Sequence, residues 1–429
     1  MTASATQRAL TTLIAEWNRA GVRWVVLGRL PSEEETGGDV DIALAHDDRK
    51  RAISLLSEVI DRECWRLVQV MQHEVTAWYA VVAIPSEYGW EFLKLDLCTD
   101  YRIGGRLLMR ADELIESSVL EEGLWSRPAA DTNAQYYLFK SLAKGRFDRR
   151  TIDFIKGQAT SQRALDSGRL TEDEQRQLDA WFDADSTPSS NAVRRVYRSL
   201  ASRRPKAHLK EWLRIAHRLR YPCGFHLVLT GPDGVGKSTV AQSLIAQLND
   251  CFRGVSKVHL FTVLSDDVDQ PKEPVTPYQK GGLGLMGSMA KLALIAARSH
   301  RLFWSFIMGR RARSFLILND RHVIDALADP KRFRLNLSPA VVRLLRYMTP
   351  SPDLVLCLEA DPQTIQARKS EVSIGQTADQ LARYRGVVKS TRYAHLIDAN
   401  ASPDEVAMRL TERCLDGLAK RQARRGWRL

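Results

Sequence analysis

The residues with the clearest capacity for chemistry form a glycine-rich segment, GPDGVGKS, at positions 231–238. The pattern GxxxxGK[ST] is typical of a phosphate-binding loop when it follows a strand and opens a helix. An apolar run precedes it at 225–230, and a helical pattern follows at 239–248. The residues expected to contact a nucleotide are Gly231, Asp233, Gly234, Gly236, Lys237, Ser238 and Thr239.

Each of these residue types has a physical reason to be there. Glycines let backbone N–H groups turn inward around a phosphate, and the helix start adds the positive end of a dipole. Lys237 is expected at the β- and γ-phosphates, and the Ser238 hydroxyl at Mg²⁺. The Asp233 carboxylate repels phosphates, so we expect it to orient a ligand. An aspartate that only favours the turn is the alternative.

A second charged group, Asp320 and Arg321, follows the apolar run at 315–319. Ligands of open α/β sheets bind outside the carboxyl ends of the strands, so this pair is expected to face the nucleotide. Asp320 is predicted to hold Mg²⁺ or its water, and Arg321 to clamp a phosphate through two N–H groups. The alternative is a surface ion pair at a strand end.

A third charged group, Arg368 and Lys369, ends a helical pattern at 362–368 that follows an apolar run at 353–358. Basic side chains on a loop beside a transferring phosphate stabilise the developing charge. A basic helix end favoured by the macrodipole explains the same residues equally well. We predict Lys237, Asp320, Arg321 and Arg368 as catalytic residues.

Together these motifs resemble the thymidylate kinase family of nucleoside monophosphate kinases, over roughly the last 200 residues. The resemblance rests on the loop at 231–238, the Asp-Arg-His at 320–322, and the strand and helix patterns near 395–418. It implies ATP and Mg²⁺ as cofactors and Arg321 at the acceptor phosphate. It also implies Asp233 near the acceptor sugar, and Arg368 or Lys369 on a lid. The charged segment at 325–334 differs from a thymine pocket, which argues against dTMP as the acceptor.

A separate set of carboxylates lies near the N-terminus: Asp39, Asp41 and Asp96. Residues i and i+2 of a strand point to the same face, so Asp39 and Asp41 converge while Val40 and Ile42 turn inward. Convergent carboxylates repel unless a cation sits between them, and Asp96 could complete a two-metal cage. A pair of acids in a surface turn is the alternative.

These carboxylates resemble the signature of the nucleotidyltransferase superfamily, over about 100 residues. Gly28 supplies the glycine of that signature, but Arg29 stands where the family has serine. The resemblance implies Asp39, Asp41 and Asp96 as metal ligands for nucleotidyl transfer.

The order of strand-like and helix-like patterns predicts an α/β chain in three parts. We expect an α+β nucleotidyltransferase-like domain at 1–127 and a helical connector at 128–220. A P-loop domain with a doubly wound parallel sheet follows at 221–429. Its strands are predicted at 226–230, 258–263, 315–319, 354–358 and 395–398. In the first domain strands are predicted at 24–27, 40–44, 77–84 and 91–97, and a helix at 49–64.

Charge, cysteine content and apolar runs limit the possible partners and location of the protein. The net charge of +12 suits polyanionic partners, and the six cysteines are scattered without a CxxC pair. They therefore predict reduced, buried thiols and a cytoplasmic location. No apolar run reaches the roughly 18 residues that span a bilayer. The segment at 194–220 is basic, and we favour a solvated helical face over contact with nucleic acid or an anionic membrane.

The sequence thus predicts a kinase that transfers the ATP γ-phosphoryl group to a small phosphorylated or hydroxylated acceptor. One alternative is a metal-dependent nucleotidyltransferase acting through its N-terminal domain, with the P-loop domain as partner. Another is a nucleotide-gated binding protein that uses the basic segment. A homodimer is left open.

Overall fold

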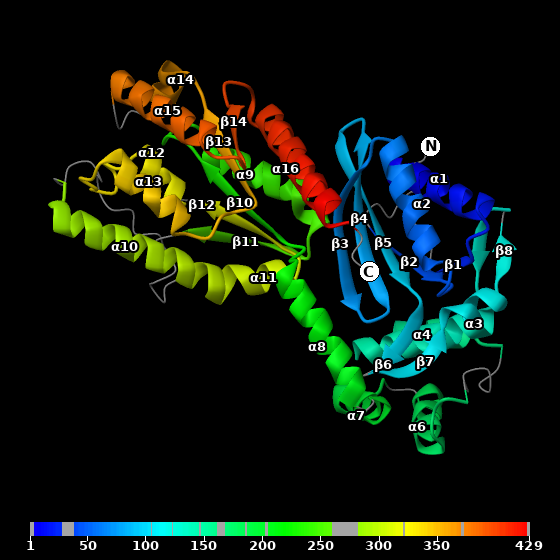
Figure 1. Ribbon diagram of the computed structural model, residues 1–429. Helices are drawn as coiled ribbons and strands as arrows, with labels where there is room; N and C mark the ends of the chain where they lie inside the picture. The colour runs from blue at the N-terminus through cyan, green and yellow to red at the C-terminus, as the bar shows by residue number, and fades with distance from the viewer. Residues whose placement is uncertain are drawn as a thin grey trace. The chain divides into compact units, whose positions relative to one another are not determined.

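The computed structural model describes residues 4–27, 38–103, 105–121, 123–145, 147–160, 168–184, 187–201, 205–259, 282–320, 322–369 and 373–426, without the side chains of 205–208. Two compact units divide the chain (Figure 1). Unit 1 comprises residues 1–216 with 425–429, and unit 2 comprises residues 217–424. Gly28, Arg29 and Arg321 lie outside the described residues, so the expectations for them stay predictions.

Unit 1 is built on a five-stranded mixed sheet in the order β1-β2-β5-β4-β3. Its strands are β1 (Trp24–Leu27), β2 (Asp39–Leu44), β3 (Arg66–Glu74), β4 (Ala77–Ser86) and β5 (Gly89–Cys98). Only the β2–β5 pair among these neighbours is parallel. Val40 and Ile42 are buried as predicted, in one core with the side chains of α1 (Ala5–Arg19) and α2 (Arg49–Arg62).

The other described elements of unit 1 are mainly helical, and their core also includes Val25, Leu27 and Ala43 of the sheet. Two short hairpins, β6 (Asp100–Ile103) with β7 (Arg106–Arg110) and β8 (Val119–Glu121) with β9 (Trp125–Arg127), lead into it. Its helices are α3 (Ala111–Glu116), α4 (Ala130–Lys144), α5 (Arg149–Gln158), α6 (Glu172–Asp183) and α7 (Ser190–Leu200). α8 (Pro205–Arg220) continues from unit 1 into unit 2.

Unit 2 contains a five-stranded parallel sheet in the order β11-β12-β10-β13-β14. The strands are β10 (Phe225–Thr230), β11 (Gly254–His259), β12 (Phe315–Asp320), β13 (Leu354–Glu359) and β14 (Ala394–Asp398). Four of them match the predicted strands within one residue. The second begins four residues earlier than predicted, and positions 260–263 of that prediction lie outside the described residues. The parallel sheet is consistent with a P-loop-like fold.

Helices cover both faces of this sheet (Figure 1). On one face, Gly417 packs on Phe225 and Leu354, and Thr411 of the same helix donates a 2.6 Å hydrogen bond to Gln247. On the other, Ile324 joins a cluster with Val228 of β10. The helical elements are α9 (Lys237–Leu248), η2 (Asn249–Cys251), α10 (Leu285–Leu302), η3 (Phe303–Ile307), α11 (Met308–Ala312), α12 (Val323–Ala328), α13 (Pro339–Tyr347), α14 (Pro362–Arg368), α15 (Ile374–Lys389) and α16 (Pro403–Arg425).

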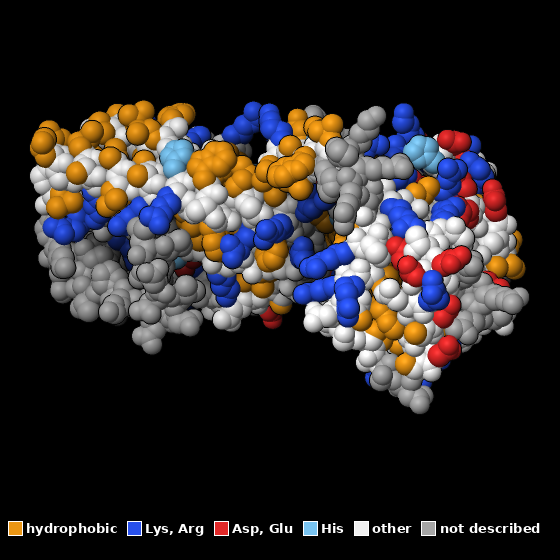
Figure 2. Space-filling model, turned by 90° about the horizontal axis from the view of Figure 1, so that it is seen from below, with side chains coloured by type: hydrophobic (Ala, Val, Ile, Leu, Met, Phe, Trp, Pro, Cys, Tyr) orange, Lys and Arg blue, Asp and Glu red, His pale blue; other side chains and the backbone are white. Residues whose placement is uncertain are grey.

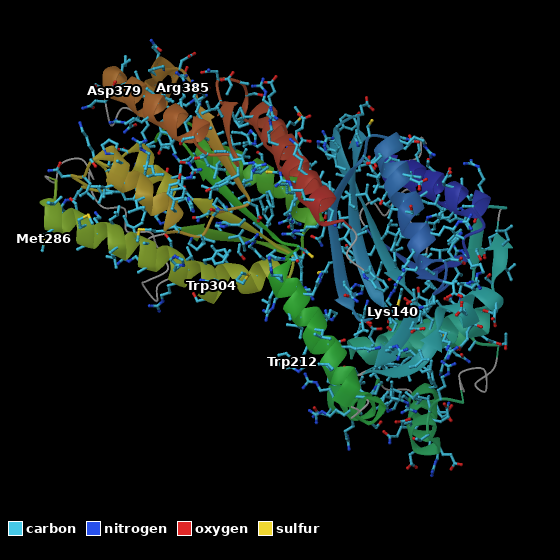
Figure 3. The ribbon with its side chains drawn as sticks, in the orientation of Figure 1. Lys140, Trp212, Met286, Trp304, Asp379 and Arg385 are labelled. Carbon is cyan, nitrogen blue, oxygen red and sulfur yellow. The ribbon has the colours of Figure 1, made fainter. Side chains whose placement is uncertain are left out.

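An exposed apolar stripe runs along α10 and η3 of unit 2, where Figure 2 shows hydrophobic side chains gathered. Its most exposed large residues are Leu285, Met286 and Trp304, which are 69%, 86% and 64% exposed. Figure 3 labels Met286 and Trp304. A stripe of this kind is where a second protein surface would pack, so the homodimer remains an open prediction.

Two predictions from composition can be compared with the structure. All six cysteines are free thiols, and five are buried, but Cys64 is exposed, so the expectation that all are buried was wrong for this residue. Cys64 follows the end of α2 with a positive φ of 57°, which places it in the turn to β3 rather than in the core. None of the described helices is long and apolar enough to cross a membrane.

Candidate functional site

The glycine-rich loop of unit 2 joins the carboxyl end of β10 to the first residue of α9, Lys237. Gly231, Gly234 and Gly236 have positive φ angles of 139°, 85° and 100°. A Cβ on Gly231 would lie 2.6 Å from the Leu358 carbonyl oxygen, and one on Gly234 would lie 2.9 Å from Lys369 Cβ. Larger residues are therefore excluded by both backbone angle and space. The sequence predicted this loop correctly as a strand-to-helix turn.

The Lys237 ammonium group folds back over the loop. Its Nζ donates hydrogen bonds to the carbonyl oxygens of Gly231 at 2.8 Å and Pro232 at 2.9 Å. The same nitrogen lies 3.5 Å from Asp233 Oδ1. The positive charge is thus held at the loop by two carbonyl oxygens and a nearby carboxylate. The next two hydroxyls, Ser238 and Thr239, are exposed at the start of α9.

Asp233 has a cationic partner besides Lys237, because Arg332 forms an ion pair with its other carboxylate oxygen. The backbone N–H of Arg332 donates to Asp329 Oδ1 at 3.3 Å, and Gln380 donates to Asp329 Oδ2 at 3.0 Å. The charged segment after α12 therefore folds onto the loop. Lys237 and Arg332 offset the negative charge of Asp233. Arg332 was missed as its partner because it lies ninety-nine positions away along the chain.

Asp320 ends β12 and pairs in register with Leu229 of the neighbouring β10. Because these strands are parallel, the exposed Asp320 residue lies at the carboxyl ends of the strands, where the loop also begins. The Arg368 guanidinium contacts the loop directly and donates to the Val235 carbonyl oxygen at 3.4 Å. Lys369 also reaches the loop, through its contact with Gly234. The predicted basic pair and the loop are therefore neighbours.

A buried carboxylate, Asp325, ties this region together and was not singled out from the sequence. It is 1% exposed. Its Oδ1 accepts hydrogen bonds from Thr230 Oγ1 at 2.6 Å and from the Tyr384 hydroxyl at 2.9 Å, and its Oδ2 accepts from the His322 N–H at 2.8 Å. It thus links β10, α12 and α15 beneath the loop. The local signal was its position three residues after His322, as at a helix start.

Two buried histidines, His226 of β10 and His322 at the N-terminus of α12, have ring centroids 6.2 Å apart. Burial lowers the pKa of His226 to about 3, with the neighbouring His322 adding to the effect. Burial also lowers the pKa of His322 to about 4. Both rings are therefore neutral in the folded protein near pH 7, and Asn319 lies 3.4 Å from His226 Nε2.

These histidines predict that stability falls in mild acid. Below the ordinary histidine pKa of 6.5, the unfolded chain takes up protons that the folded chain refuses. The free energy of unfolding of unit 2 should therefore decrease as pH falls from 6.5 toward 4.5. Urea unfolding at several pH values measures the slope, which His226→Gln should reduce. An unchanged slope in His226→Gln would show that the ring does not govern this loss.

The carboxylates of unit 1 come together on the parallel strand pair β2–β5, where Asp41 and Asp96 are direct register partners. Lys140 of α4, labelled in Figure 3, forms an ion pair with Asp41. The Tyr79 hydroxyl donates to Asp39 Oδ1 at 2.8 Å, and His73 Nε2 lies 3.5 Å from Asp96 Oδ1. Sequence reasoning missed Lys140, which comes from a distant helix.

The pKa of Asp96 is strongly shifted from its ordinary value. Burial first, and then the charge of Asp41, raise the pKa of Asp96 to about 7, while Lys140 opposes the rise. Lys140→Met should therefore raise the pKa of Asp96 further. Carbon-13 NMR titration of the Asp96 carboxyl measures it, with Lys156→Met on an exposed site of α5 as control. An unshifted titration would mean that Lys140 does not act on this carboxylate.

Oxygen ligands for a hard cation are present in both units. In unit 2 the exposed Ser238 hydroxyl and Asp320 carboxylate are of the type that Mg²⁺ prefers. In unit 1 a cation would have to displace Lys140 from Asp41. Over the described ranges, no three or more His, Cys, Asp or Glu side chains are grouped so that they could hold a metal ion.

No protein-family model and no curated protein matches the chain. Among solved structures, a thymidylate kinase from Candida albicans is similar over 44% of this chain and 90% of that chain. The identity is 19% and the TM-score is 0.34. Similarity this low does not establish an activity.

Proposed function

We propose that unit 2 is an ATP- and Mg²⁺-dependent phosphotransferase of the nucleoside monophosphate kinase type. The observation that carries this proposal is the loop from Gly231 to Lys237 at the carboxyl edge of a parallel sheet, with Arg368 on its backbone. Asp320 ends the neighbouring strand at the same edge. This arrangement offers backbone N–H groups, an ammonium group and a guanidinium group to one polyanion.

The chain's own residues supply positioning and charge. Lys237 exchanges the carbonyls of Gly231 and Pro232 for oxygens of the β- and γ-phosphates. Ser238 and Asp320 would hold Mg²⁺, which, when bound, neutralises phosphate charge. An acceptor oxygen bonds to the γ-phosphorus while the bond to the β–γ bridging oxygen breaks, and ADP leaves with that electron pair. A hydroxyl acceptor releases its proton to water. Arg368 stabilises the charge on the transferred group.

The acceptor side is formed by charged groups. Asp233 with Arg332, and Asp329 with Gln380, lie beside the loop. Such groups suit an acceptor that carries phosphate or hydroxyl groups. We therefore keep the acceptor as a small phosphorylated or hydroxylated molecule.

The test is incubation of the whole protein with Mg²⁺ and ATP labelled at the γ-phosphate, over a panel of nucleoside monophosphates, nucleosides and sugars. Label should move to at least one acceptor class, and omission of Mg²⁺ should stop the transfer. Absence of ATP binding, with no label transferred to any acceptor or to water, would contradict the proposal.

Nucleotidyl transfer by unit 1 is a second candidate, favoured by the register pairing of Asp41 with Asp96. ATP labelled at the α-phosphate separates the two activities, because only nucleotidyl transfer leaves that label on the product. The ion pair between Lys140 and Asp41 predicts weak cation affinity for this unit.

A further inference from the structure

The helix α8 exposes a broad apolar face. Leu209, Trp212 and Leu213 are 59%, 69% and 61% exposed, and Ala216 is exposed as well. Their spacing of three, four and seven residues places them on one side of a helix. Ile215 and Leu219, 41% and 43% exposed, widen this face. Figure 3 labels Trp212 on α8. Large apolar side chains exposed in a continuous face mark an interaction surface.

The same helix is strongly cationic beside its apolar face. Lys210 and Arg220 are exposed, whereas the Arg218 guanidinium donates to the Ala312 carbonyl oxygen at 3.0 Å and 2.6 Å. The single acid of α8, Glu211, is already paired with Arg214 at 2.7 Å. The preceding α7 buries Val193, Val196 and Leu200 and exposes three arginines, Arg194, Arg195 and Arg198.

We propose that α8 docks the protein on the surface of an anionic lipid bilayer. A helix with Trp and Leu on one face and Lys and Arg on the other lies in the plane of the interface. Its apolar side chains enter the boundary of the acyl chains while its basic side chains meet anionic headgroups. With 16 residues, α8 is about 24 Å long, which suits lying in the interface rather than spanning it.

The apolar residues decide between a bilayer and a nucleic acid. A nucleic acid would engage the exposed basic side chains, with aromatic rings stacking on bases. The exposed face of α8 is instead mainly aliphatic, with Leu209, Leu213, Ile215 and Leu219 around one tryptophan. Aliphatic side chains gain little from phosphates and bases but gain from entry into a bilayer. The sequence alone favoured a solvated face for 194–220, and the exposure of α8 argues for a membrane contact.

The test is co-sedimentation of the full chain with vesicles of phosphatidylcholine alone or mixed with phosphatidylglycerol, at low and high salt. Binding should require phosphatidylglycerol and weaken at high salt. Trp212→Ser with Leu213→Ser should weaken vesicle binding by about tenfold or more, because both apolar side chains lose the free energy of transfer into the bilayer. Lys210→Ser with Arg220→Ser should weaken it roughly fivefold to twentyfold.

Matched controls test whether the loss of binding is specific to α8 or follows from removing any exposed aromatic or basic side chain. Tyr88→Ser changes an aromatic residue that is 91% exposed in the turn between β4 and β5. Lys50→Ser with Arg51→Ser removes an exposed basic pair from α2. Both should bind vesicles like the wild type, and thermal unfolding checks that every variant is folded. No binding at low salt, or equal loss in controls and α8 variants, would overturn the proposal. So would a Trp212-dependent dimer or DNA complex in place of vesicle binding.

Discussion

Lys237→Ala should abolish phosphoryl transfer while leaving the protein folded. The Lys237 side chain is 12% exposed, and its Nζ donates to the Gly231 and Pro232 carbonyl oxygens at 2.8 Å and 2.9 Å and lies 3.5 Å from Asp233 Oδ1. Alanine removes the ammonium group that we propose contacts the triphosphate. Loss of such a charge contact to a transferring phosphoryl group costs roughly 10³-fold or more in kcat.

The measurement is steady-state transfer of labelled γ-phosphate, with circular dichroism of the purified variant to confirm folding. Lys257→Ala is the matched control, because Lys257 is an exposed lysine on β11 of the same sheet. It should transfer phosphate at the wild-type rate. Normal turnover by Lys237→Ala would remove the loop from the catalytic site.

Asp353→Ala should destabilise unit 2 by about 3–5 kcal/mol, as expected when one partner of a buried ion pair is removed. Its carboxylate accepts from Arg311 at 2.8 Å and from the His226 N–H at 2.8 Å, and Arg421 lies 3.4 Å away. The change leaves two arginines without their shared counter-ion. It also removes a link between β13, the end of α16 and the start of β10.

Chemical denaturation measures the loss, with Asp398→Ala as control. Asp398 is more exposed and 3.9 Å from Arg409, so its removal should cost at most about 1 kcal/mol. Burial alone would raise the pKa of Asp353, but Arg421 and Arg311 lower it below its ordinary value. This stabilisation is therefore present above the ordinary pKa of aspartate and is lost as pH falls through the lower folded value. Equal effects of the two variants would contradict the buried-triad account.

The strands of unit 2 were predictable because each is a buried run in a parallel sheet, and such strands are almost continuously apolar. Strand β3 of unit 1 was not predicted, since an edge strand keeps polar residues such as Gln69 and Gln72 among its apolar ones. The glycine loop was predictable because its chemistry is local. The ion pairs of Arg332 with Asp233 and of Lys140 with Asp41 join residues about a hundred positions apart, and no local pattern announces them.

The exposure of the basic segment at 194–220 could not be predicted from the sequence either. Its charge could be counted from the sequence, but a periodic apolar pattern does not tell whether a face is buried or exposed. In α7 the apolar face is buried in the core of unit 1, whereas in α8 the corresponding face is exposed. Only the fold separates these two neighbouring helices.

The central claim is that the loop at 231–238 holds a triphosphate. A crystal structure of the whole protein with Mg²⁺ and a non-hydrolysable ATP analogue tests it most directly. We predict the β-phosphate on backbone N–H groups between Gly234 and Ser238, with Lys237 Nζ moved from the carbonyls of Gly231 and Pro232 to phosphate oxygens. A nucleotide bound elsewhere, or Lys237 still on those carbonyls beside a bound nucleotide, would contradict the account.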